Sequence, residues 1–135
     1  MRREGTEKAR NGGSAVGRTH HNLLAWQEAM ELVKVVYQTT SHFPAFENFG
    51  LSNQLRRAAI SIPSNIAEGA GREGAKEFLE FLSIARGSLS ELETQILLAR
   101  DLGYLPNPDN LIFSIDRLFA LIGGLMNSLR KRITK

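Results

Sequence analysis

The chain has 135 residues, enough for one domain with a sizeable core. It contains no cysteine, which excludes disulfide frameworks and thiolate metal sites and suits the cytoplasm. Its formal net charge is +3, but residues 1–21 carry net +3 and residues 130–135 net +4, so the body between them is acidic, at net −4. A polyanion is therefore expected to be drawn mainly to the ends of the chain, or to local patches of positive charge, since the body as a whole is not basic.

The first segment, residues 1–21, is polar, contains glycine and has no periodicity. This predicts a disordered basic leader before a folded domain of residues 22–135, with an RNA-binding arm as the alternative. His20 and His21 have no carboxylate or third histidine nearby, so no metal site is expected. The leader lacks the apolar region of a secretory signal, and no apolar run approaches the roughly 18 residues of a membrane span.

The first helix is predicted to begin after Asn22 as N-cap and to stop before Phe43 and Pro44, because a residue before proline avoids helical geometry. Its large apolar residues step by four and three, as in the buried seam of a bundle helix. We expect this seam to contain Trp26, Met30, Val33, Tyr37 and Thr40.

The second helix is predicted to run from about Glu47 to Glu68 or Gly69. Its apolar row keeps helical register across Pro63, which favours one kinked helix over two short helices joined by a loop at residues 61–64. The expected core row is Leu51, Leu55, Ala58, Ile62 and Ile66.

A polar row follows the same rhythm about 100° away on this helix. Glutamine, serine and asparagine are poorer fillers of a helix surface than lysine or glutamate. The row is therefore either plain solvated surface or a bonded polar seam. It consists of Gln54, Arg57, Ser61, Asn65, Glu68 and Arg72.

The turn at residues 69–74 reads G-x-G-x-x-G, but a helix and not a strand precedes it, so it does not predict a dinucleotide site. Gly69 is predicted to end the second helix in left-handed geometry. Gly74 lies three residues before Glu77, which leaves a capping box without its Ser or Thr half.

The third helix has the most regular row, and it is expected to end at Gly103. Gly87 lies inside it beside Ser83 and Ser88, which predicts close approach of a neighbouring helix or another subunit. The expected core row is Phe78, Leu82, Ala85, Leu89, Leu92, Ile96 and Ala99.

The fourth helix carries two apolar rows, more than a monomeric bundle needs. This predicts a subunit contact that includes Phe119 and Met126, with a wide core face as the alternative. The core row is Leu111, Ile115, Leu118, Ile122, Leu125 and Leu129, and the second row is Ile112, Phe119, Met126 and Ile133.

Three motifs are specific enough to indicate a family: Phe49-Gly-Leu, Ser61-Ile-Pro-Ser-Asn-Ile-Ala-Glu-Gly and Ala85-Arg-Gly-Ser. With them the chain resembles the 23S rRNA intervening-sequence family of four-helix bundles. The resemblance covers about residues 22–105. It implies a ring-shaped homopentamer and a Ser or Thr at Gly74, where this chain departs. A similar bundle is the accessory variability protein of diversity-generating retroelements, which works with a reverse transcriptase and nucleic acid.

No arrangement of nucleophile, base and orienting group is apparent, so no enzyme, cofactor or small-molecule substrate is expected. Two kinds of polar site are predicted instead. A structural seam that satisfies itself between helices or subunits contains Arg57, Asn65, Glu68, Arg86 and Glu91. A nucleic-acid site contains Arg130, Lys131, Arg132, Lys135, Arg56 and Arg72. In the alternative interpretation Arg57 also contacts phosphate.

The sequence therefore predicts an all-α, antiparallel, up-down-up-down four-helix bundle that forms a homo-oligomer. The first functional hypothesis is a non-enzymatic bundle that binds RNA or a ribonucleoprotein. The second is a protein-interaction scaffold, such as a reverse-transcriptase accessory subunit, without direct binding to nucleic acid.

Overall fold

The computed structural model describes residues 18–134, so residues 1–17 of the predicted leader and Lys135 lie outside the described residues. It contains four α-helices and two short 3-10 helices: η1 (Thr19–Asn22), α1 (Leu24–Thr40), η2 (Ala45–Glu47), α2 (Leu51–Ala70), α3 (Ala75–Asp101) and α4 (Asp109–Ile133). No strand occurs between residues 18 and 134, and the prediction of an all-α protein with four helices is confirmed.

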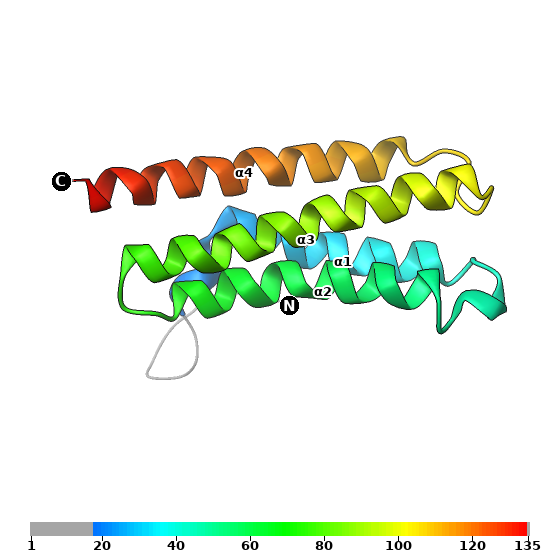
Figure 1. The fold of residues 1–135 in the computed structure, drawn as a ribbon, viewed down its shortest axis with the longest axis horizontal. Helices are drawn as coiled ribbons and strands as arrows, with labels where there is room; N and C mark the ends of the chain where they lie inside the picture. Colours follow the sequence, from blue (N-terminus) through cyan, green and yellow to red (C-terminus); the bar gives the residue numbers. More distant parts are fainter. Residues whose placement is uncertain (1–17, 135) are drawn as a thin grey trace.

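The four helices lie side by side along the long axis of the molecule, and the loops between them lie at alternating ends (Figure 1). Contacts join α1 to α2, α2 to α3, α3 to α4 and α4 back to α1, and the most extensive contact is between α2 and α3. Since α4 has 25 residues and α1 has 17, α4 is longer by about 12 Å. α1 therefore covers only part of α4.

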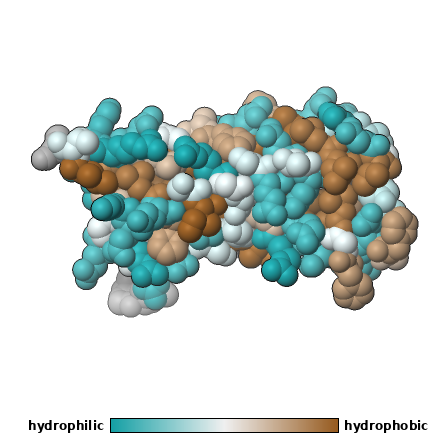
Figure 2. Space-filling model, viewed as in Figure 1, coloured by the Kyte–Doolittle hydropathy of each residue, from teal (hydrophilic) through white to brown (hydrophobic). Residues whose placement is uncertain are grey.

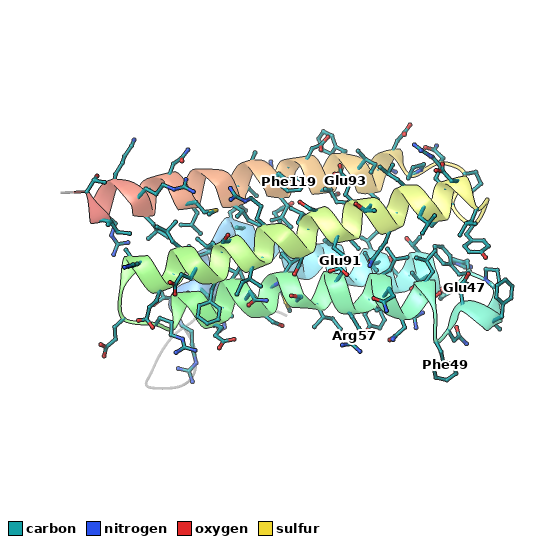
Figure 3. The ribbon with its side chains drawn as sticks, in the orientation of Figure 1. Glu47, Phe49, Arg57, Glu91, Glu93 and Phe119 are labelled. Atoms are coloured by element: carbon teal, nitrogen blue, oxygen red, sulfur yellow. The ribbon has the colours of Figure 1, made fainter. Side chains whose placement is uncertain are left out.

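One apolar cluster with members from all four helices forms the core. The predicted rows of α2 and α3 are confirmed, with Leu51 and Phe78 half-buried at their ends. In α4 the predicted core row is also buried, except for Leu125, which is half-buried. Met126, predicted in the second row, is buried instead and is only 2% exposed. Met126 therefore packs inside its own chain and is removed from the predicted subunit contact, whereas Phe119 is half-buried beside α3 (Figure 3).

The predicted seam of α1 is wrong apart from Thr40. Met30 and Tyr37 are 39% and 42% exposed, and Trp26 and Val33 are only half-buried. The core instead receives a row of smaller residues that lies one position earlier. Small side chains let α1 approach its neighbours closely, which a pattern of large residues cannot reveal. The buried row of α1 is Ala25, Ala29, Leu32, Val36 and Thr40.

The beginning of α1 also differs from the prediction. Asn22 ends η1, and Leu23 is the N-cap of α1, with no capping hydrogen bond from its side chain. The last residues of the predicted leader, from Thr19 onward, are thus part of this short 3-10 helix.

Pro63 lies inside one continuous α2, as predicted. The helix begins later than predicted, at Leu51, because η2 precedes it. The carboxylate of Glu47 accepts hydrogen bonds from the Leu51 backbone N–H and from the Tyr104 hydroxyl, both at 2.9 Å. One side chain thus caps α2 and ties the α1–α2 loop to the α3–α4 loop.

Gly69 does not end α2 in left-handed geometry; it lies within the helix and is buried. An added Cβ would lie 2.7 Å from Phe81 Cβ and 2.9 Å from Phe78 Cδ1, so glycine is needed where α2 and α3 approach. The left-handed glycine is Gly103, with a φ of 84°. There the N–H groups of Gly103 and Tyr104 donate to the carbonyls of Arg100 and Ala99 and end α3.

We predict that Gly69→Ala destabilises the fold. The new methyl group would press on the Phe81 Cβ, which is fixed to the backbone of α3. Overpacking of this kind costs about 1–3 kcal/mol, which exceeds the gain of about 1 kcal/mol from replacing a helical glycine. Urea denaturation measures the difference. An unchanged or higher free energy of unfolding would show that the two helices separate without cost.

We predict that Gly74→Ser stabilises the fold by a few tenths of a kcal/mol. Gly74 is the N-cap of α3 with a φ of −114° and a ψ of 152°, angles that serine adopts freely, and no side-chain cap is present. An added Cβ meets nothing within 4 Å, and the Ser-x-x-Glu box with Glu77 would be complete. A clear fall in thermal stability would contradict this account of the cap.

Candidate functional site

A polar cleft of about 360 Å³ lies between α2 and α3. Three residues of the polar row of α2, Gln54, Arg57 and Ser61, face α3 across it. Arg57 and Glu91 come to the cleft from the two facing helices (Figure 3). The lining residues are Gln54, Arg57, Ala58, Ser61, Ser88 and Glu91.

Hydroxyl and amide groups bond the two walls of this cleft. Ser61 Oγ and Ser88 Oγ are 2.8 Å apart and share one hydrogen bond between α2 and α3. Asn65 Nδ2 donates to the carbonyl oxygen of Ser61 at 2.8 Å and to its hydroxyl at 3.0 Å. Part of the predicted polar seam is therefore bonded, next to the proline in α2.

The charged members of the predicted seam behave differently. Glu68, on α2, pairs at 2.9 Å with Arg72 in the turn just after α2. Both side chains are about half exposed, so the pair adds little stability. Between residues 18 and 134 no ion pair joins α2 to α3, and the Arg86 side chain, half-buried on α3, has none either. Arg57 and Glu91 thus remain on opposite walls without bridging them.

Arg56 on α2 and Arg72 in the turn after it, both predicted to contact nucleic acid, have partners within the chain. Arg56 Nε donates to Thr40 Oγ1 at 2.9 Å, and its guanidinium lies 5.1 Å from the centre of the Tyr37 ring. The Arg72 guanidinium bonds Glu68 and lies 4.9 Å from the Phe81 ring centre. Both side chains therefore help to hold neighbouring helices together.

The basic end of α4 consists of Arg130, Lys131 and Arg132, all exposed in its last turn. Cations at a helix C-terminus are favoured by the helix dipole. Arg130 Nη1 donates to Asn127 Oδ1 at 3.0 Å. This partner is a neutral amide, so the contact does not neutralise the charge of Arg130. Of the predicted nucleic-acid residues these three form one cluster, and Lys135 lies outside the described residues.

An apolar groove of about 330 Å³ between α1 and α2 is a site that the sequence did not reveal. It is lined by large residues of α1 whose regular spacing predicted a core seam. The same spacing also fits an outward row that lines a groove. The rings of His20 and His21 lie 5.0 and 5.1 Å from that of Trp26 at one end of the groove. Partial burial, then the charges of His21 and Arg18, lower the pKa of His20. The groove is lined by His20, Trp26, Met30, Val33, Ile60, Pro63, Ser64 and Ala67.

The side chains at these sites offer hydrogen bonds, charge and apolar contacts. The Ser61 hydroxyl has Ser88 and Asn65 as partners, and neither is a general base. The described part of the chain contains no group of three or more His, Asp or Glu side chains that could hold a metal ion.

By length and composition alone, α4 is the one helix among residues 18–134 that would be able to cross a membrane, a test that core helices also pass. The sequence of this segment has no unbroken apolar run of that length, because Asp116 and Arg117 interrupt it. Of the residues in its apolar window 28% are buried; among the rest, Phe113 is exposed, whereas Phe119 and Leu125 are half-buried against the core.

Comparison with known proteins identifies a family and solved structures of similar fold. The sequence model of the 23S rRNA-intervening sequence protein family matches residues 21–124. A crystal structure of a protein of unknown function from the S23 ribosomal protein family of Bacteroides thetaiotaomicron superimposes with a TM-score of 0.57 at 18% identity, covering 83% of this chain and all of that one. That likeness concerns the fold alone. No curated protein matches the chain.

We predict that the bond between Ser61 and Ser88 couples the two helices energetically. In a double-mutant cycle, Ser61→Ala and Ser88→Ala should show a coupling of about 0.5–1.5 kcal/mol in the free energy of unfolding. Pairing Ser61→Ala with Ser90→Ala is the control, since Ser90 Oγ bonds only the carbonyl of Arg86 in its own helix. Strictly additive effects of the first pair would contradict the prediction.

Proposed function

This chain belongs to the 23S rRNA-intervening sequence protein family, and on that premise we propose that it is a non-enzymatic, cytoplasmic homo-oligomer that binds RNA or a ribonucleoprotein. Its unit is an antiparallel up-down-up-down bundle, an arrangement supported by loops at alternating ends (Figure 1). The observation that carries the proposal is the basic end of α4.

The basic end is an electrostatic site on an otherwise acidic body. Residues 22–129 carry net −4, so they repel a polyanion, whereas Arg130, Lys131 and Arg132 are exposed together. Single-stranded RNA presents one phosphate per nucleotide, and each phosphate that is neutralised releases counterions. Consecutive residues of a helix point about 100° apart, so the three cations surround the helix end and raise its potential. Their contacts to phosphates would position RNA without reading its sequence.

Self-association multiplies this site. In a closed ring each subunit presents the same end, so the basic ends repeat around one face and their potentials add. The family resemblance implies a ring-shaped homopentamer. α4 exposes Phe113 at 72% and Ile133 at 46%, and this apolar surface supports such association.

A second candidate function is a protein-interaction scaffold, which the opposite end of the molecule favours. Phe46 and Phe49 are 77% and 98% exposed in the α1–α2 loop. Phe49 projects away from the helices (Figure 3), and the face seen in Figure 2 carries apolar surface toward this end. Exposed phenyl rings on a loop held by Glu47 suit a protein partner.

We predict that changing Arg130, Lys131 and Arg132 together to glutamine weakens binding to a single-stranded RNA oligonucleotide. The slope of log affinity against log salt should become shallower by about 0.7 for each lost phosphate contact. Fluorescence anisotropy at several salt concentrations measures both. Circular dichroism and light scattering should be unchanged, because the three side chains are exposed.

The matched control changes Lys34, Lys76 and Arg100 to glutamine, which alters the net charge equally at exposed positions elsewhere. This control should bind RNA as the wild type does. If both triple variants lose affinity equally, only net charge matters and no site exists at the basic end. If Arg57→Ala stays folded and loses binding while the basic-end variant does not, the site lies on α2.

A further inference from the structure

α1 carries two apolar rows, and the chain buries only one of them. The inner row of small residues faces the core, while Trp26, Met30, Val33 and Tyr37 remain half-buried or exposed. This outer row steps by four, three and four, the pattern of a helix seam that packs against another helix. It borders the groove of about 330 Å³ between α1 and α2, together with Ile60 on the opposite wall. The middle of this row, at Met30 and Val33, is thus without a covering helix, whereas His20 and His21 of η1 lie against Trp26 and Arg56 lies over Tyr37.

α4 has an outward face without a neighbour in the chain. Phe113, Ala120 and Gly124 are all exposed and lie within about 40° of one another around the helix, opposite the buried row. Arg117 lies in the same row and is also exposed, and its side chain pairs with Glu28 of α1. Phe113 is 72% exposed. Gly123 and Gly124 each weaken a helix by about 1 kcal/mol, yet a Cβ on either would meet nothing within 4 Å. Packing within this chain therefore gives no reason for two adjacent glycines.

The two surfaces match in length and complement each other in size. Trp26 to Tyr37 and Phe113 to Gly124 each span eleven residues, about 17 Å of helix. The row on α1 is made of large side chains, whereas the face of α4 has alanine and glycine, which leave room for them. Ridges formed by large residues pack into the grooves that small residues leave.

The two surfaces lie on different sides of the bundle. Among the described residues α4 contacts α1 and α3 but not α2, whereas the groove lies between α1 and α2. One copy therefore cannot fill its own groove with its own α4. A contact between two different surfaces of identical subunits is head-to-tail, and such contacts close into rings when the rotation allows.

We propose that, in the homo-oligomer, the outward face of α4 (Phe113, Ala120 and Gly124) docks in the α1–α2 groove of the next copy. This rests on the proposed self-association and specifies the surfaces that make it. A stable contact buries about 800 Å² on each partner, roughly a tenth of the 7677 Å² surface, so each subunit has room for both halves of the contact. All basic ends then lie on one side of the assembly.

The test uses two double variants that each spoil one surface. Met30→Glu with Ile60→Glu places charge in the groove, at positions that are 39% and 42% exposed. Ala120→Glu with Gly124→Glu places charge on the outward face of α4, where an added Cβ at Gly124 has open space. Glutamate is a good helix former, so the monomers should stay folded, which circular dichroism checks. Gly87→Glu with Thr94→Glu, both exposed on α3, is the matched control.

Light scattering should find the wild type and the control as the same oligomer and each of the other variants as a monomer. An equimolar mixture of the groove variant and the α4 variant should form a dimer of twice the subunit mass, because it contains one intact copy of each surface. Trp26, the only tryptophan, lines the groove, so its fluorescence should shift to the blue in that mixture.

Other results would overturn the proposal in distinguishable ways. If either variant alone remains an oligomer, or if the mixture stays monomeric, this docking is wrong while self-association stands. If only the α3 control dissociates, the subunits meet through Gly87 and not through α4. A monomeric wild type overturns both the docking and the proposed homo-oligomer. Binding of that monomer to lipid vesicles would assign the apolar face to a membrane.

Discussion

The close approach of α2 and α3 is the constraint on which the rest of this structure depends. The approach is possible because Gly69 has no side chain where it meets Phe81. The hydrogen bond between Ser61 and Ser88 links the two helices at a second point. The regular apolar rows of both helices are buried in this contact and in the common core. α1 and α4 complete the bundle, α1 with a row rich in alanine, and each keeps apolar surface outside. The same packing that makes the core thus leaves the two surfaces that we assign to assembly.

The sequence predicted well wherever one apolar row stood between polar flanks. α2 and α3 are of this kind, and their rows continue correctly across Pro63 and up to Gly103. Prediction failed where two apolar rows lie one residue apart. Ala29 competes with Met30 in α1, and Met126 with Leu125 in α4. Periodicity is the same for both rows, so only the space left by neighbouring helices decides which one faces inward. Gly69 was misread for the same reason.

The candidate sites were predictable to the extent that they depend on one helix. The polar row of α2 and the cluster of cations at the end of α4 follow from spacing and charge alone. The bonds across the cleft do not, because they depend on the register between two helices. Serine and asparagine form them, and the expected pairing of arginine with glutamate between α2 and α3 does not occur within the described residues. The α1–α2 groove was hidden because its residues were assigned to the core.

Assembly is the proposed source of function. Three cations on one subunit bind RNA weakly, whereas their repetition around a ring binds it strongly. The most direct measurement compares the affinity of one long single-stranded RNA for the wild type and for the monomeric Ala120→Glu, Gly124→Glu variant, at equal subunit concentration. Both proteins carry the same Arg130, Lys131 and Arg132. We expect the wild type to bind roughly a hundredfold more tightly, through simultaneous contacts. Equal affinity per subunit would contradict the claim that assembly creates the site.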